Sequence, residues 1–205
     1  MMYPQDWKNV EGYAFYRINR WSDSSRNGRA HIEFVLRGGH STNRTALVGG
    51  FVQKCEASSY HFNFYTTGRA TFERDNMHNE GYTKDNPQKL DAFEFAQGKW
   101  IGYKVCLYNV PGDRNPYPEF VKLESYVTEP FDDLAAAKSK RWRKVLEYTD
   151  RGGWKVRQFN NCDGNDDHIV SWGGPCAVLR SDNLLDYDIG PASFREVELK
   201  KGGTP

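Results

Sequence analysis

The chain has 205 residues, and its 28 Lys and Arg residues nearly balance its 27 Asp and Glu residues, for a formal net charge of +1. This balance disfavours a general nucleic-acid binder, in which basic residues would be in excess. No apolar run approaches the ~20 residues needed to cross a bilayer, and the first residues lack the apolar core of a signal peptide. Aromatic residues make up 15% of the chain, which is typical of a β-protein that binds sugars through aromatic ring faces.

Alternation of apolar and polar residues predicts about ten β-strands in chain order and very little helix. The predicted strands cover residues 10–20, 29–37, 45–54, 60–67, 99–108, 120–127, 142–148, 168–172, 176–180 and 192–199. A short helix is expected at Asp132–Lys138, which has acidic residues in its first turn. The irregular polar stretch 68–97 is expected to be a functional loop. These elements predict one all-β sandwich domain over residues 1–205.

Two of these strands carry unusual polar faces. In the first, apolar residues alternate with charged ones: Ala30, Ile32, Phe34 and Leu36 on one face, and Arg29, His31, Glu33 and Arg37 on the other. In the second, His61, Asn63 and Tyr65 share the face opposite Tyr60, Phe62 and Phe64. Because alternate residues of a strand point to the same side, the two polar rows can meet in one groove that accepts an anionic ligand. The alternative is a solvated ladder of charges.

Several segments resemble a concanavalin A-like jelly roll, the fold of legume lectins, many glucanases and alginate-lyase-type polysaccharide lyases. They are the stretch Lys99 to Lys104, the strand Val121 to Glu124, the turn Trp172 to Pro175 and the strand Phe194 to Val197. Arg29, Glu33 and Arg37 approximate the Arg-x-Glu-x-x-x-Arg pattern of a concave strand in the lyases. The resemblance implies a β-jelly-roll sandwich of two antiparallel sheets whose concave groove binds an acidic polysaccharide.

Cleavage of such a polysaccharide by β-elimination requires a neutralised uronate carboxylate, a base for the C5 proton and an acid for the leaving oxygen. We expect Arg37 and Asn63 to neutralise the carboxylate, His61 to be the base and Tyr65 the acid. Further substrate contacts are expected from a larger set of groove and rim residues: Arg29, His31, Glu33, His40, Trp172 and Arg180. Trp172 would be a stacking platform.

Two other functions are compatible with the sequence. The first is a non-catalytic lectin or carbohydrate-binding module that uses the same groove. The second is a glycoside hydrolase, which needs two carboxylates roughly 5 to 9.5 Å apart; Glu124 with Glu129, and Asp91 with Glu94, are the nearest pairs in the sequence. Neither pair lies on a convincing groove strand, so hydrolysis is the less favoured reading.

Cofactor and compartment expectations rest on a few residues. Asp163 begins an oxygen-rich stretch of the kind that Ca²⁺ prefers, and the resemblance implies a structural calcium near Asp186 or Asp188. Four cysteines without CxxC spacing make a zinc site unlikely; Cys55 and Cys162 could form a disulfide, with Cys106 and Cys176 as thiols. We expect a secreted monomer whose partner is an anionic polysaccharide, and neither nucleic acid nor a membrane.

Overall fold

The computed structural model describes residues 2–22, 30–38, 45–48, 51–54, 58–75, 83–113, 118–155, 167 and 169–198, with side chains described outside 2–5, 45–48 and 51–54. Within these ranges the protein is built almost wholly from antiparallel strands, and no described helix is long and apolar enough to cross a membrane. Secretion stays a prediction. The disulfide between Cys55 and Cys162 also stays a prediction, because both cysteines lie outside the described residues. Cys106 and Cys176 are free thiols, as predicted.

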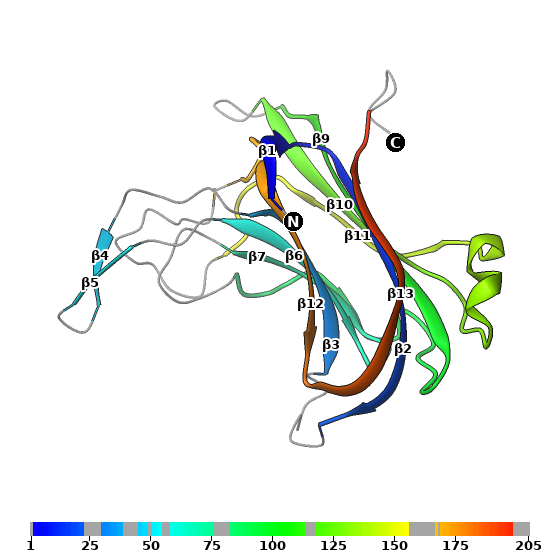
Figure 1. The fold of residues 1–205 in the computed structure, drawn as a ribbon. Helices are drawn as coiled ribbons and strands as arrows, with labels where there is room; N and C mark the ends of the chain where they lie inside the picture. Colours follow the sequence, from blue (N-terminus) through cyan, green and yellow to red (C-terminus); the bar gives the residue numbers. More distant parts are fainter. Residues whose placement is uncertain are drawn as a thin grey trace.

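Two antiparallel sheets face each other (Figure 1). The first, here called sheet A, has the order β1 (Met2–Trp7), β12 (Gly174–Asp182), β3 (His31–Gly38), β6 (Ser59–Tyr65), β7 (Ala70–Asp75) and β8 (Gln88–Lys89). The second, sheet B, has the order β11 (Arg143–Asp150), β10 (Glu119–Val127), β9 (Trp100–Pro111), β2 (Val10–Trp21) and β13 (Leu184–Glu196). The predicted all-β sandwich is confirmed.

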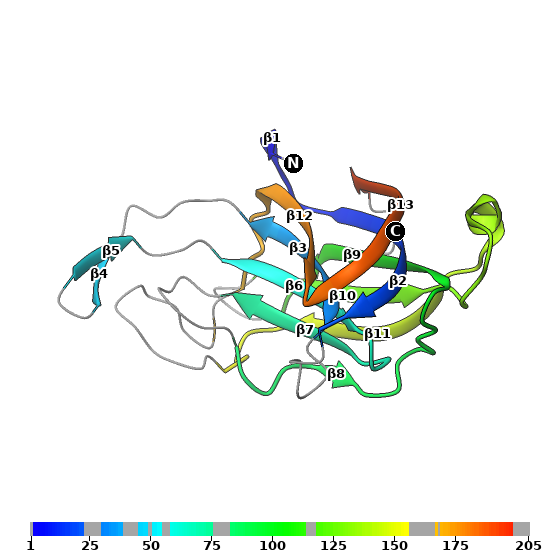
Figure 2. The same cartoon turned by 60° about the horizontal axis from the view of Figure 1, so that its bottom comes forward.

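Smaller elements stand at the two ends of the sandwich. A hairpin of β4 (Thr45–Val48) and β5 (Phe51–Lys54) projects at one end, and the 3₁₀ helix η1 (Leu134–Ser139) projects at the other (Figure 2). The predicted helix is therefore one short 3₁₀ segment, and Asp133 caps it by accepting a hydrogen bond from the Ala135 backbone N–H at 2.9 Å. The segment predicted as a strand at 168–172 contains no strand in its described part, 169–172.

The core forms from the apolar faces that the alternation predicts. Ile32, Phe34 and Leu36 of β3 are fully buried, and in sheet B Val105 and Leu107 of β9 join them in one apolar cluster. Burial of a large apolar side chain contributes about 1.5–3 kcal/mol. The same alternation leaves the odd-numbered residues of β3 and the even-numbered residues of β9 on the outer faces of their sheets.

Arg37 departs from the alternation. The pairing of β3 with β12 passes from Leu36 to Gly38, so Arg37 is an extra residue in a β-bulge, with a left-handed φ of 60°. Its backbone lies so close to Gly174 that a Cβ there would be 2.4 Å from the Arg37 carbonyl, so only glycine fits. The side chain is turned away from the outer face and donates to the Val170 carbonyl at 2.5 Å and to Asn109 Oδ1 at 2.6 Å.

A second buried arginine joins the two sheets. Arg74 of β7 and Asp150 of β11 have fully buried side chains and form an ion pair with 2.9 Å between Nη1 and Oδ2. The Tyr60 hydroxyl donates to the same carboxylate at 2.7 Å, and Arg74 Nη2 donates to the Trp154 carbonyl at 2.9 Å. Because each charge depends on its partner in a dry environment, removal of either one leaves an uncompensated charge.

The Asp150→Asn substitution should therefore lower the free energy of unfolding by about 3–5 kcal/mol, as measured by urea denaturation. The matched control is Asp132→Asn, which removes an exposed carboxylate paired with Lys99 and should change that energy by less than about 1 kcal/mol. Equal effects of the two substitutions would contradict the assignment of the buried pair.

Candidate functional site

The outer face of sheet A brings together six of the residues predicted for the site: His31, Glu33, His61, Asn63, Tyr65 and Arg180. In the β3–β6 register His31 lies opposite Tyr65 and Glu33 opposite Asn63. The His31 and Tyr65 rings are 4.8 Å apart between centroids, and Arg180 of β12 pairs with Glu33 across the neighbouring strand. His31 and Glu33 therefore share one face with the polar row of β6, as the alternation predicted, whereas Arg37 does not.

His61 is held within this face by acidic partners. Its Nδ1 lies 2.6 Å from Glu33 Oε1, and its Nε2 lies 2.9 Å from Ser59 Oγ and 3.6 Å from Asp75 Oδ2. Burial alone would lower the pKa of His61, but the hydrogen bonds and charges of Asp75 and Glu33 raise it to about 9. His61 is therefore a cation near neutral pH, which does not suit the role of general base.

The same face is largely closed to a polymer. Glu33 is 3% exposed, His61 4% and Asn63 2%, so these three side chains are buried. The charges of Glu33 and His61 are also balanced within the protein, because Glu33 contacts both His61 and Arg180. The predicted cluster exists, but its geometry is that of an internal charge network.

A possible metal-binding group lies at the edge of this network. His31, Glu33 and Asp182 each offer a ligand atom, and these atoms lie within 4.8 Å of one another. The Arg180 guanidinium contacts two members of this group, with Nε 2.9 Å from Glu33 Oε2 and Nη2 2.5 Å from Asp182 Oδ2. Its guanidinium already supplies positive charge to both carboxylates. Calcium binding stays a prediction.

The other predicted residues lie apart from this face or outside the described residues. Arg37 is turned into the protein by the bulge, so it does not share a groove with His61. Trp172 is 47% exposed in the segment before β12. Asp186 and Asp188 of β13 contact side chains of β2 instead of forming a joint oxygen cluster: Asp188 pairs with Arg17 at 2.8 Å and Asp186 accepts from Asn19 at 3.5 Å. Arg29, His40 and Asp163 lie outside the described residues.

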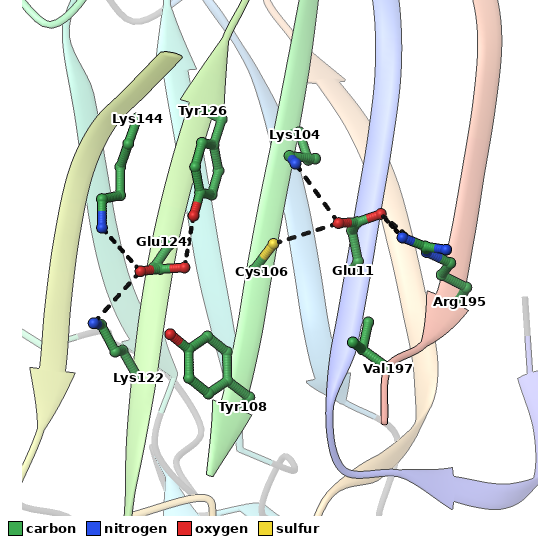
Figure 3. A pocket seen from close by; sticks show the side chains of 10 residues that line it. All are labelled: Glu11, Lys104, Cys106, Tyr108, Lys122, Glu124, Tyr126, Lys144, Arg195 and Val197. Atoms are coloured by element: carbon green, nitrogen blue, oxygen red, sulfur yellow. Dashed lines mark hydrogen bonds and ion pairs between the residues drawn. The ribbon is translucent and has the colours of Figure 1, made fainter. Parts of the chain in front are cut away.

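An open groove lies on the outer face of sheet B (Figure 3). A hollow of about 460 Å³ crosses β11, β10, β9, β2 and β13. Its lining combines cationic, phenolic and carboxylate side chains: Glu11, Lys104, Cys106, Tyr108, Lys122, Glu124, Tyr126, Lys144, Arg195 and Val197. We call this hollow the central groove.

Glu124 organises one half of the central groove (Figure 3). The Tyr126 hydroxyl donates to its Oε2 at 2.7 Å, Lys144 Nζ donates to Oε1 at 3.1 Å, and Lys122 Nζ lies 3.5 Å from Oε1. Burial opposes ionisation of Glu124, but these partners lower its pKa. Burial and the nearby Glu124 raise the pKa of Tyr126, and they raise that of Tyr108 to about 12. Both phenols therefore keep their protons near neutral pH.

Glu11 organises the other half. Arg195 approaches Glu11 Oε1 with Nη2 at 2.8 Å and Nε at 3.0 Å, and Lys104 Nζ lies 3.7 Å from Oε2. These ion pairs require an ionised carboxylate. The Cys106 thiol donates to Glu11 at 3.8 Å, and its pKa is raised to about 12, mainly by burial. Cys106 is therefore a protonated thiol and not a nucleophile.

A second hollow of about 590 Å³ adjoins the central groove, because both are lined by Glu11, Lys104 and Arg195. It extends past Tyr13 and Trp142 towards η1. Among the described residues, the two hollows are lined by six cationic side chains (Lys104, Lys122, Lys138, Lys140, Lys144 and Arg195) and by two carboxylates, Glu11 and Glu124. The surplus of positive charge suits an extended anionic ligand.

The signal for this groove was present in the sequence but was not used for the site prediction. Lys104, Cys106 and Tyr108 alternate with the apolar core residues of β9, and Lys122, Glu124 and Tyr126 alternate with the inward-facing residues of β10. Each row has the period of two that identified β3 and β6. The two rows lie side by side, because Lys104 pairs with Tyr126, Cys106 with Glu124 and Tyr108 with Lys122 in the β9–β10 register.

Comparisons with known proteins show a loose likeness in fold between this β-sandwich and solved structures. No protein-family model matches the chain, and no curated protein matches it in sequence. Among solved structures, the chain is 14% identical to a double mutant of the alginate lyase Aly36B in complex with alginate tetrasaccharide, over 96% of this chain and 72% of that chain, with a TM-score of 0.37. It is 9% identical to the marine PL-14 alginate lyase from Aplysia kurodai, over 95% and 72% of the two chains, with a TM-score of 0.41. The function proposed below therefore rests on the groove residues.

The His61 network generates a prediction for stability. Because the pKa of His61 is about 9 in the folded protein and about 6.5 when unfolded, its contribution is fully present below pH 6.5 and is lost as the pH rises through 9. The loss is on the order of 3 kcal/mol. Urea denaturation between pH 6 and 9.5 should show this decline in wild type and a flatter profile in His61→Gln. Parallel profiles would contradict the assignment.

Proposed function

We propose that the protein binds an acidic, uronic-acid polysaccharide along the outer face of sheet B and cleaves it by β-elimination. The observation that carries the proposal is the central groove itself, in which four cationic side chains and two protonated phenols surround Glu11 and Glu124. Glu124 and Tyr108 of the groove are buried, but its four cationic side chains are partly or largely exposed. On sheet A, Glu33, His61 and Asn63 are all buried. The cations of the central groove suit carboxylates and its aromatic rings suit the apolar faces of sugars.

The chemistry of elimination assigns roles to these groups. Arg195 and Lys104 would stabilise the substrate carboxylate, which makes the neighbouring C5 proton more acidic. Glu11 lies between these two cations, and its carboxylate would accept that proton. Tyr126 keeps its proton at neutral pH, so its hydroxyl would protonate the leaving glycosidic oxygen. Glu124 holds Tyr126 and the two lysines in place.

A non-catalytic binding module with the same groove is the competing function. Elimination creates a conjugated double bond that absorbs near 235 nm, whereas binding does not. Incubation with alginate, glucuronan and pectate should therefore raise this absorbance with at least one substrate. Binding without absorbance would support the module, and new reducing ends without absorbance would indicate hydrolysis.

A matched pair of phenol substitutions distinguishes the two faces. Tyr126→Phe should lower kcat by about 10²–10⁴-fold, the usual contribution of a positioned acid. Tyr65→Phe removes the phenol on sheet A that the sequence had suggested as the acid, and it should leave kcat within about threefold of wild type. The measurement is the initial rate at 235 nm. Loss of activity in Tyr65→Phe with normal activity in Tyr126→Phe would move the site to sheet A.

A further inference from the structure

We propose that the second hollow, between η1 and β13, is a separate sugar-binding subsite in which Trp142 stacks on a sugar ring of the bound chain. The inference rests on the proposed function, because it extends the central groove along the same polysaccharide. The shared residues Glu11, Lys104 and Arg195 make the two hollows continuous. A chain that occupies the central groove therefore has a path into the second hollow.

The floor of the second hollow is aromatic and well supported. The Trp142 indole lies 5.7 Å from the Phe15 ring and 6.4 Å from the Tyr13 ring, between centroids. Phe15 is buried and also packs edge-on against Phe131 at 5.9 Å. Trp142 and Tyr13 are only partly buried, so their rings are both fixed from below and accessible to a ligand. Rigid, accessible aromatic rings are well suited to sugar faces.

Glycine makes room for this arrangement. A Cβ at Gly102 would lie 2.8 Å from Cη2 of Trp142 and 2.7 Å from Phe15, so the absence of a side chain lets the indole lie close to sheet B. A Cβ at Gly190 of β13 would lie 2.9 Å from Leu134, which allows η1 to pack against the strand. The wall formed by η1 is thus packed onto the sheet in advance of any ligand.

Cations accompany the aromatic floor. Lys104 Nζ lies 5.4 Å from the centroid of the Trp142 ring and 4.6 Å from that of Tyr126, so this one ammonium stands between the two hollows. Lys138 and Lys140 line the second hollow from the side of η1. A sugar stacked on Trp142 would therefore have its carboxylate near positive charge. The expected ligand unit is another uronate residue of the same chain.

The test compares long and short substrates. A subsite beyond the reactive bond is filled only by a chain long enough to reach it, so Trp142→Ala should lower kcat/KM about tenfold on the polymer. On the shortest oligosaccharide that is cleaved, the same substitution should change kcat/KM by less than about threefold. Trp142→Phe, which keeps a ring over Phe15, should recover part of the loss.

Leu90→Ala is the matched control, because Leu90 is an exposed large apolar side chain that lines neither hollow. It should behave as wild type on both substrates. Equal losses on long and short substrates in Trp142→Ala, or no loss on either, would overturn the subsite. If wild type neither binds nor cleaves any acidic polysaccharide, the proposed function fails instead; normal wild-type activity with an unaffected Trp142→Ala rejects the subsite alone.

Discussion

The two-residue repeat of the β-strand is the constraint on which the groove depends. In β9, Val105 and Leu107 are buried between the sheets, so Lys104, Cys106 and Tyr108 must stand on the outer face. Slippage of the strand by one residue would bury the lysine and expose the valine, at a cost of several kcal/mol. The apolar core therefore fixes the positions of the groove residues as firmly as it fixes the fold.

The two outer faces differ in how their charges are balanced. On sheet A, Glu33 is 3% exposed and contacts His61 and Arg180, so positive and negative groups satisfy one another within the protein. On sheet B, Lys122 and Lys144 converge on the single carboxylate of Glu124 while remaining partly exposed. Exposed ion pairs contribute about 0–1 kcal/mol to stability. The lysines of sheet B are therefore readily available to an anionic ligand.

Much of the architecture was predictable from local patterns, whereas the location of the open groove was not. Alternation around Phe34 and Phe62 identified two neighbouring strands and their polar faces correctly. Arg37 was misplaced because its bulge depends on a close approach to Gly174, a residue distant in sequence. The sequence also contains the row of Lys104 and Tyr108, but alternation alone does not reveal which of two outer faces is open. Burial of His61 depends on tertiary structure in the same way.

Chemical footprinting of lysines offers the most direct test of ligand binding to the sheet B groove. Reductive methylation of the protein, with and without a uronic-acid polymer, would be followed by mass spectrometry at each lysine. Binding in the groove predicts that the polymer protects Lys104, Lys122 and Lys144, whereas Lys84 and Lys89, which lie outside the groove, react equally in both samples. Unchanged reactivity of the three groove lysines, with protection elsewhere or nowhere, would contradict it.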